Sequence, residues 1–353
     1  MPIYLHGLST ALPQYFLHQS EVAERAEILF GAKYPQFQRL ARTFRTSGID
    51  RRHSVVPMDW FSQDHGWKDR SDAYMSGASA LFVQAANAAL LEAGWAAAEV
   101  DCIVTVSSTG IATPTLEAQV FGDMGFREDV MRVPVFGLGC AGGVSGLSIA
   151  SALARGGAGA KVLLVVIETC SLSFRADRLQ KADIIAAVLF GDGAAAACVS
   201  AEKPCGKFVV LRRGYQKLWP DTLKIMGWDV DDTGLGVIFD RSIPDFVSEE
   251  FAQATQGALK AAGLDHGQID RYVCHPGGAK VVAAIEDALD LTRGSLDAER
   301  QVLRDAGNMS APTVLFVLRA VLDVGTTGQM MACALGPGFT ASYLPLDIEG
   351  QAA

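Results

Sequence analysis

The sequence predicts an α/β fold built from two duplicated halves. Residues 133–168 run from an apolar strand through a glycine-rich turn into a helix and a second strand, a unit typical of α/β proteins. A pattern of Ala-Leu-x-x-Ala-Gly at 89–94 returns at 258–263, an offset of 169 residues from 89 to 258. The 353 residues, of which 50% are hydrophobic, suffice for a large core shared by two domains. We therefore expect an N-terminal half at 1–203 and a C-terminal half at 204–353.

The elements of the first half follow from apolar spacing and from turn residues. Alternation predicts strands, spacing of three and four predicts helices, and Gly94 after an alanine-rich segment is a candidate helix C-cap. In chain order we expect a strand at 3–9, helices at 19–30 and 76–92, a strand at 102–108, a loop at 110–115, a helix at 116–124, and the strand–turn–helix–strand unit at 133–168.

The remaining segments are predicted on the same grounds. Residues 171–182 are polar and irregular, and residues 184–200 are typical of a turn followed by a strand of small residues. After a polar break at 203–207, we expect a strand at 208–211, a loop or hairpin at 221–236, a helix at 246–262 and a strand from 272 that ends in His275.

The internal repeat also aligns two polar residues. In a second register, with an offset of 168 residues from 140 to 308, Gly139-Cys140 falls on Gly307-Asn308. Cys140 and Asn308 would then stand at the mouths of two equivalent central helices, and a pseudo-twofold axis would bring these mouths together. Chance matches among alanines and glycines are the alternative, but the constant order and near-constant offset favour duplication.

Cys140 lies at a helix N-terminus, where the helix dipole and unpaired N–H groups favour a thiolate. We expect a lowered pKa and a nucleophilic role, and a buried structural cysteine is the alternative. The segment 137–142, GLGCAG, is also a literal G-x-G-x-x-G, and Glu168 ends the next strand, which together fit a dinucleotide site. An isolated histidine is more often structural, but His275 at a strand end beside a duplicated Cys/Asn pair is a catalytic candidate.

Composition narrows the classes of function. The net charge of −9 argues against non-specific nucleic-acid binding. The seven cysteines, which form no C-x-x-C pair, suggest a reduced cytoplasmic protein without a structural zinc site. No apolar run reaches the roughly 18 residues of a membrane span, and the N-terminus lacks the pattern of a signal peptide. We therefore expect a cytoplasmic protein with no nucleic-acid partner and no stable membrane insertion.

A basic cluster stands out in this acidic chain. Its members are Arg39, Arg42, Arg45, Arg51 and Arg52. They fit either a solvated helix face or a docking site for an anionic ligand such as a phosphate-bearing cofactor. The residues alone leave both interpretations open.

Four motifs in one order carry a family resemblance: GCAGG around Cys140, FGDGAAA at 190–196, HPGG at 275–278 and GNMSAPTVLF at 307–316. With them the chain resembles the thiolase superfamily and, within it, the type III polyketide synthases (chalcone-synthase-like enzymes), from about residue 3 to residue 346. The resemblance implies a thiolase-like fold with five layers, α-β-α-β-α, and a homodimer. It weakens the dinucleotide interpretation, and HPGG in place of His-Gln-Ala-Asn disfavours the initiating ketoacyl-ACP synthases.

The resemblance also implies catalytic roles for three residues. Cys140 would take a starter acyl group from CoA and hold the growing chain, paired with His275. His275 and Asn308 would hold the thioester oxygen of malonyl-CoA while it loses CO2. This chemistry requires no metal and no redox cofactor, because loss of CO2 generates the carbanion directly and amide and imidazole N–H groups stabilise the enolate oxygen. Both substrates are CoA thioesters.

Further positions match the gate, the CoA site and the pocket of the family. Phe190 resembles the gate between the CoA tunnel and the cavity, and Arg39 and Arg42 match positions that contact CoA phosphates. The positions that would shape the substrate pocket are Ser108, Thr113, Cys170, Ser173, Trp228, Val237, Ser310 and Leu335. Thr113 stands in place of a methionine that reaches across the dimer in the family.

The pocket positions bear on the product. Segments 108–115 and 226–236 are similar to bacterial members that extend fatty acyl starters into alkylresorcinols or alkylpyrones. Val237 and Leu335 would make room for an alkyl chain, whereas Trp228 fills volume. We therefore expect a fatty acyl-CoA starter, a malonyl-CoA extender and an alkylresorcinol or alkylpyrone product. The alternatives are a malonyl-CoA-only synthase of the tetrahydroxynaphthalene or phloroglucinol type and, from another class, a non-catalytic dinucleotide-binding or scaffold protein.

Overall fold

The computed structural model describes residues 1–31, 34, 36–157, 159–175 and 180–349. Its strands are β1 (Ile3–Ala11), β2 (Tyr15–His18), β3 (Arg51–Ser54), β4 (Cys102–Val106), β5 (Met131–Val135), β6 (Val162–Thr169), β7 (Asp192–Ser200), β8 (Phe208–Leu211), β9 (Tyr215–Leu218), β10 (Met226–Asp231), β11 (Gly234–Phe239), β12 (Arg271–Cys274), β13 (Gly328–Gly336) and β14 (Thr340–Glu349). Its α-helices are α1 (Gln19–Phe30), α2 (Phe37–Thr46), α3 (Trp67–Ala93), α4 (Leu116–Gln119), α5 (Phe121–Met124), α6 (Gly142–Gly156), α7 (Lys181–Leu189), α8 (Ile243–Ala262), α9 (Ala279–Ala288), α10 (Asp297–Ala306) and α11 (Thr313–Asp323). Short 3₁₀ helices include η1 (Met58–Ser62), η3 (Gly139–Ala141) and η4 (Cys170–Ser173).

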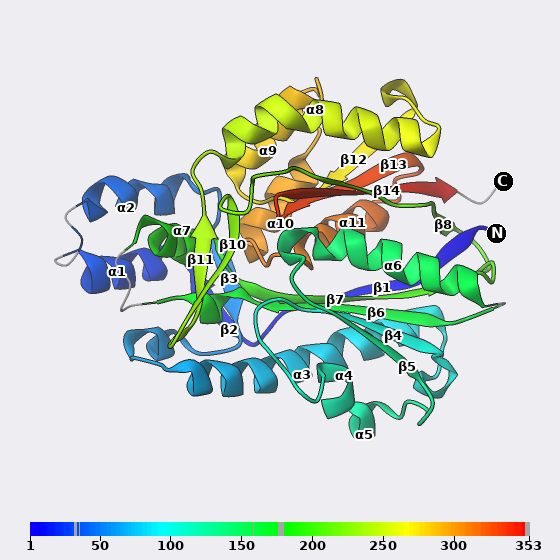
Figure 1. Ribbon diagram of the computed structural model, residues 1–353, viewed down its shortest axis with the longest axis horizontal. Coiled ribbons are helices and arrows are strands. Elements are labelled where there is room, and N and C mark those ends of the chain that lie inside the picture. The colour runs from blue at the N-terminus through cyan, green and yellow to red at the C-terminus, as the bar shows by residue number, and fades with distance from the viewer. Residues whose placement is uncertain (32–33, 35, 158, 176–179, 350–353) are drawn as a thin grey trace.

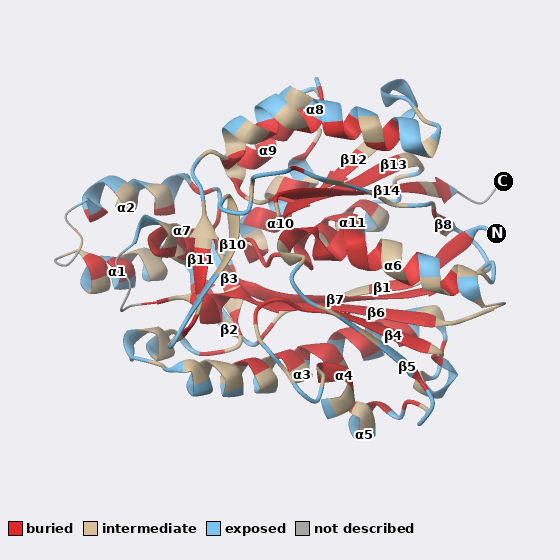
Figure 2. Cartoon of the chain, viewed as in Figure 1, coloured by how far each residue is buried: buried red, intermediate tan, exposed pale blue. Residues whose placement is uncertain are grey.

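These elements stack in five layers (Figure 1). Helix α3 covers the outer side of strands β1, β7 and β6, helices α6 and α11 lie between the two sets of strands, and α8 and α9 cover the outer side of β12, β13 and β14. Figure 2 shows that burial is concentrated in the strands and in the helix sides that face them. The predicted α/β fold with an α-β-α-β-α architecture is confirmed.

The strand order shows the duplication. In the first half the order is β1-β7-β6-β4, with two antiparallel pairings followed by a parallel one. In the second half the order is β8-β14-β13-β12, with the same succession of directions. Strand β8 also pairs with β1, which joins the halves into one hydrogen-bonded path, and β5 extends the first half beyond β4. Equal order and direction in both halves are what a duplicated chain requires.

The two central helices approach each other through small residues. Helix α6 contacts β4 and β6 on one side and β13 and β14 on the other. Near the start of α11, a Cβ on Gly143 would lie 2.3 Å from the carbonyl oxygen of Ala311. Only glycine allows this close approach of the two backbones. The small residues of α6 therefore serve the contact between the two halves.

One predicted element is wrong. The sequence predicts a turn and then a strand over 184–200, but Lys181–Leu189 form helix α7, and strand β7 begins at Asp192. The run from 184 to 189 is apolar throughout, and periodicity alone does not separate a buried helix from a buried strand in so short a run. The expected irregular segment 171–182 includes 176–179, which lie outside the described residues. Within the described parts of the chain, no helix has both the length and the apolar character needed to cross a membrane.

Candidate active site

Cys140 lies in the turn between β5 and α6, within η3. Gly139, just before it, has a left-handed φ of +46°. A Cβ on Gly139 would lie 2.7 Å from Cδ of Pro337, and one on Gly336 would lie 2.7 Å from Cβ of Ala141. Glycines at both positions therefore let the end of β13, from the second half, pack directly on the cysteine turn of the first half.

The charge state of Cys140 differs from the expectation. Burial raises the pKa of the Cys140 thiol to about 11, and the carboxyl of Glu168 adds to the increase, although hydrogen bonding by Ser310 and Asn308 opposes it. The sequence predicts a lowered pKa from the helix N-terminus. This expectation is wrong because removal from water outweighs the favourable dipole and hydrogen bonds. The resting side chain is a neutral thiol that needs a base.

His275 directly follows β12, and its backbone N–H donates to the carbonyl of Cys333 at 2.8 Å. Its side chain is 4% exposed, and among the described residues neither ring nitrogen has a hydrogen-bond partner. Burial lowers the pKa of His275 to about 3, so the imidazole is neutral. A neutral imidazole can accept a proton at one nitrogen and donate a hydrogen bond from the other.

Asn308 precedes α11, at the place that corresponds to Cys140 in the other half. Its Nδ2 donates to the carbonyl of Gly277 at 3.1 Å, and its Oδ1 accepts from the N–H of Ser310 at 2.8 Å. These bonds turn the amide nitrogen toward the loop that follows His275. Cys140, His275 and Asn308 line one cavity, although the chain separates the first from the last by 168 residues. The convergence predicted from the repeat is present.

Phe190 follows α7 and lies beside Asn308. The two residues form an isolated parallel β-bridge, in which Asn308 N–H donates to the carbonyl of Leu189 at 2.8 Å and Gly191 N–H donates to the carbonyl of Asn308 at 3.0 Å. The ring of Phe190 stands edge-on to the ring of Phe239, with centroids 6.4 Å apart. The backbones of the expected gate and of the expected amide donor are therefore linked directly.

A cavity of about 200 Å³ adjoins Cys140. The expected pocket residues that line it are Ser108, Cys170, Trp228, Val237 and Ser310. Trp228 and Val237 come from the β10–β11 hairpin, and Trp228 Nε1 donates to the carbonyl of Ser108 at 2.7 Å. This bond ties the hairpin across the cavity and holds the indole as one of its walls.

The other expected pocket residues lie outside this cavity. Leu335 lines the adjoining cavity that contains His275. The Ser173 hydroxyl donates to the carbonyl of Cys170 at 2.7 Å. Ser173 lines a third, mostly apolar cavity. Thr113 is exposed on the loop before α4 and lines neither of the two cavities that contain Cys140. Position in a motif indicates the neighbourhood of these residues, but the direction of each side chain depends on tertiary packing.

The dinucleotide interpretation of segment 137–142 does not hold. Glu168, which would bind the ribose, is buried and accepts hydrogen bonds from Ser108 N–H at 2.9 Å and from Thr109 Oγ1 at 2.8 Å. Burial raises the pKa of Glu168 to about 8. A carboxyl enclosed in this way cannot reach a ribose, and the glycines of the motif serve the packing of the cysteine turn.

The basic cluster separates into an exposed and a buried part. The exposed arginines on α2 are Arg39, Arg42 and Arg45. On β3, Arg51 pairs with Asp305 at 3.4 Å, and Arg52 is buried. The α2 arginines and the exposed Arg51 can therefore reach an anion in solvent, whereas the buried Arg52 cannot. Among the residues that the structure describes, no group of His, Cys, Asp or Glu side chains could hold a metal ion.

Four residues of the hairpin line the cavity without having been expected from the sequence: Gly227, Ile238, Met226 and Phe239. Met226 and Phe239 line the cavity together with Trp228 and Val237. In the β10–β11 ladder, Met226 pairs with Phe239 and Trp228 pairs with Val237. Alternate residues of paired strands face the same side of a hairpin. Predicting the hairpin register, and not only the segment, would have identified Met226 and Phe239.

Family profiles match nearly the whole chain. Residues 4–203 match the chalcone and stilbene synthases, N-terminal domain, and residues 210–345 match the C-terminal domain. A 1,3,6,8-tetrahydroxynaphthalene synthase of Streptomyces peucetius subsp. caesius is 36% identical over 351 residues, which cover 96% of this chain and 92% of that protein. An alpha-pyrone synthesis polyketide synthase-like protein of Mycobacterium tuberculosis is 28% identical and covers 98% of this chain and 91% of its own.

Solved structures share the fold over the full chain. The crystal structure of 1,3,6,8-tetrahydroxynaphthalene synthase from Streptomyces coelicolor A3(2), described as a bacterial type III polyketide synthase, has a TM-score of 0.93 and 28% identity. The match covers 99% of this chain and 100% of that one. With both family profiles matched and the 36% identical relative spanning almost its full length, the chain belongs to the chalcone and stilbene synthase family and is a type III polyketide synthase.

Proposed function

We propose that Cys140, His275 and Asn308 catalyse the decarboxylative condensation of malonyl-CoA with an acyl group held on Cys140. The observation that supports this most strongly is the convergence of a thiol, an imidazole and a carboxamide on one enclosed cavity from both halves of the chain. The three groups supply a nucleophile, a base and an oxyanion donor, which together are what acyl transfer requires.

Loading starts from the neutral thiol. His275 takes the proton of Cys140 Sγ as the sulfur attacks the thioester carbon of an acyl-CoA. The bond from that carbon to the CoA sulfur then breaks, and CoA leaves with the proton that His275 returns. Burial raises the pKa of Cys140 and lowers the pKa of His275, so both groups are neutral before the attack and the proton must move as the sulfur attacks.

Extension requires an enolate and a place for its charge. Malonyl-CoA loses CO2, and the electron pair of the broken C–C bond becomes the enolate of the remaining thioester. Asn308 Nδ2 carries two hydrogens and gives one to Gly277, which leaves the other for the enolate oxygen, and an N–H of His275 is the second donor. One preorganised donor of this kind is worth about 100- to 1,000-fold in rate. The enolate carbon then attacks the thioester on Cys140, whose sulfur leaves as thiolate.

CoA binding is assigned to the outer face of α2. We propose that Arg39 and Arg42 bind CoA phosphates, because guanidinium groups bind phosphate through paired N–H donors. Helix α2 packs against α7, which ends next to Phe190, and this contact supports a path from α2 to the gate. We propose that the protein is a cytoplasmic homodimer. Each chain consists of two halves, 1–203 and 204–353, which meet in the break between β7 and β8.

For the product, we place a small aromatic polyketide made from malonyl-CoA alone ahead of a fatty-acyl-derived one. The cavity of about 200 Å³ at Cys140 is smaller than the roughly 300–1,000 Å³ of pockets that hold drug-sized ligands, and Trp228 occupies one side of it. The 36% identical relative is named a tetrahydroxynaphthalene synthase. The fatty acyl starter, which the sequence favoured, becomes the second candidate, and the 28% identical protein named for alpha-pyrone synthesis supports it.

The starter is tested with malonyl-CoA alone and with acyl-CoAs of increasing chain length, with products read by mass spectrometry. We expect product from malonyl-CoA alone, and we expect Trp228→Ala to accept longer acyl groups because it enlarges the cavity. Val230→Ala, on the same hairpin but 64% exposed, is the matched control and should not change the product range. A wild-type protein that forms product only with long acyl-CoAs would reverse the order of the two candidates.

The catalytic roles are tested by separating loading from decarboxylation. We expect Cys140→Ala to form no covalent acyl adduct by intact-protein mass spectrometry. Asn308→Ala should keep the adduct while CO2 release from malonyl-CoA falls by about 100- to 1,000-fold, because one oxyanion donor is lost. A wild-type protein that never carries an acyl group on Cys140 would refute the proposal.

A further inference from the structure

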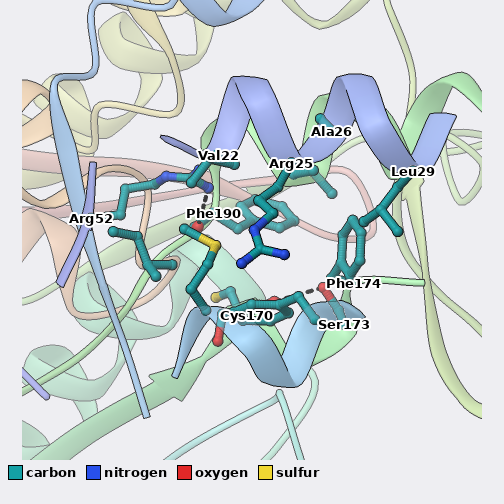
Figure 3. A pocket seen from close by; sticks show the side chains of 15 residues that line it. Val22, Arg25, Ala26, Leu29, Arg52, Cys170, Ser173, Phe174 and Phe190 are labelled. Atoms are coloured by element: carbon teal, nitrogen blue, oxygen red, sulfur yellow. Dashed lines mark hydrogen bonds between the residues drawn. The ribbon is translucent and has the colours of Figure 1, made fainter. Parts of the chain in front are cut away.

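Arg52 holds the backbone of the gate residue from behind. It lies on β3, is 3% exposed, and donates from Nη1 to the carbonyl of Phe190 at 2.7 Å (Figure 3). The N–H of Phe190 donates to the carbonyl of Ala186 at 2.9 Å. The backbone of Phe190 is therefore held on both sides, while its ring borders both the cavity at the catalytic cysteine and the cavity drawn in Figure 3.

Two glycines make room for the Arg52 side chain. A Cβ on Gly307 would lie 2.6 Å from Cγ of Arg52, and a Cβ on Gly191 would lie 3.3 Å from Cβ of Arg52. Gly191 directly follows Phe190, and Gly307 directly precedes Asn308. The aliphatic stem of Arg52 thus lies against the gate segment and the amide segment at the same time. A larger residue at position 307 could not occupy this space.

Asp192 provides the countercharge for the buried guanidinium. Burial lowers the pKa of Arg52 to about 10, and the carboxylate of Asp192 opposes that decrease, so Arg52 is a cation at neutral pH. Asp192 accepts from Ser171 N–H at 2.7 Å, from Ser171 Oγ at 2.6 Å and from Val55 N–H at 2.8 Å. Two guanidinium nitrogens of Arg52, Nε and Nη2, are buried without a hydrogen-bond partner among the described residues, so Asp192 balances the charge of Arg52 through space and not by direct contact.

These contacts connect Arg52 with both sides of the bridge between Phe190 and Asn308. We propose that Arg52 is a positioning residue. It fixes the backbone of Phe190 and, through the β-bridge, the backbone and hence the side-chain carboxamide of Asn308. The ring of Phe190 can then move while the carboxamide stays in place. The inference rests on the gate and oxyanion roles proposed above. It adds a residue that touches neither substrate nor the reacting atoms.

The test compares Arg52→Met with Arg52→Lys. Methionine keeps an unbranched stem but loses the donors and the charge, whereas lysine keeps the charge and one donor for the Phe190 carbonyl. In Arg52→Met we expect kcat for CO2 release from malonyl-CoA to fall by about 100-fold, since a displacement of about 1 Å in a positioned group costs about that much. Acyl loading on Cys140 should remain stoichiometric, and Arg52→Lys should restore part of the lost rate.

A matched control is Arg155→Met. Arg155 also donates to a backbone carbonyl, that of Leu211 at 3.0 Å, but it lies at the far end of α6 from Cys140. This variant should leave both loading and decarboxylation unchanged. Equal losses of loading and decarboxylation in Arg52→Met, or no loss in either, would overturn the inference.

Hydrogen exchange separates this inference from the proposed function. In Arg52→Met the amides of Gly191 and Asn308, which bond across the bridge, should exchange faster than in the wild type, while the amides of β6 should not. This result is independent of activity. Unchanged exchange at the bridge would overturn the role of Arg52 even if the catalytic roles stand, and a wild-type protein without loading or decarboxylation would refute the catalytic roles alone.

Discussion

At the scale of the residue, burial controls which groups in the cavity carry charge. It raises the pKa of Cys140 to about 11 and lowers the pKa of His275 to about 3, so the pair is neutral before substrate arrives. The motif around Cys140 singled out this residue as the candidate nucleophile. The helix-dipole argument gave the wrong direction for its pKa because the dipole acts against a desolvation that depends on residues from the other half of the chain.

Glu168 carries a prediction about pH. Burial raises its pKa from 4.5 to about 8, so between these two values the folded protein binds more protons than the unfolded chain. The free energy of unfolding should therefore fall as the pH rises from about 5 to 8. The total fall is about 1.4 kcal/mol for each unit by which the pKa in the folded protein exceeds the pKa in the unfolded chain. In urea titrations at pH 5 and pH 8, Glu168→Gln should show a smaller fall in the midpoint than the wild type.

Other buried carboxyls also titrate between pH 5 and pH 8, so the contribution of Glu168 is the difference between Glu168→Gln and the wild type. Burial raises the pKa of Asp192 to about 6 and that of Glu299 to about 7, and both groups act in the same direction in either protein. Glu128→Gln, at an exposed position, is the control and should follow the wild type. The prediction fails if Glu168→Gln loses as much stability as the wild type over this range.

At the scale of the element, the contact between α6 and the start of α11 joins the two halves. A Cβ on Gly143 would lie 2.3 Å from the Ala311 carbonyl oxygen and 2.8 Å from Cγ1 of Val314. Gly143→Ala should therefore lower the free energy of unfolding by about 1–3 kcal/mol, measured by chemical denaturation. Gly156→Ala, in the same helix but with nothing within 4 Å of its Cβ, should be neutral or slightly stabilising. Equal effects of the two substitutions would contradict this account of the contact.

Elements also show where local sequence was insufficient. The apolar run at 184–189 was predicted as part of a turn and strand, whereas it forms the end of α7 against α1 and α2. The β10–β11 segment was predicted as a loop or hairpin without a register, so Met226 and Phe239 were missed as lining residues. In both cases the neighbouring elements, which local spacing does not describe, select the structure.

At the scale of the whole molecule, the free edge of the sheet points to the proposed homodimer. Strand β5 ends the strand order, and its neighbourhood exposes Ile111, Met131 and Phe136, each between 55% and 56% exposed. Exposed apolar side chains gathered at one edge of the sheet form a surface against which a second copy can pack. The exposed Thr113 lies on the loop beside this edge.

Light scattering in solution tests this assembly. We expect the wild type to have the mass of a dimer and Phe136→Glu to shift toward the monomer, because a charge would be buried without a partner. Val324→Glu, at a position that is 80% exposed on the end of α11, should remain a dimer. A monomeric wild type, or a Phe136→Glu variant that stays fully dimeric, would refute the proposed face.

The repeat indicated two duplicated halves, and the family resemblance carried by four motifs implied the five-layer fold and the roles expected of Cys140, His275 and Asn308, because repeats and motif order can be read from the linear sequence. Three features could not be predicted in this way. They are the exposure of each arginine in the basic cluster, the direction of the Ser173 side chain and the charge states of the groups in the cavity. Each depends on contacts between segments far apart in the chain, such as Arg52 with Phe190 at 2.7 Å. Burial and side-chain direction are properties of the packed core, and they exist only once the two halves have come together.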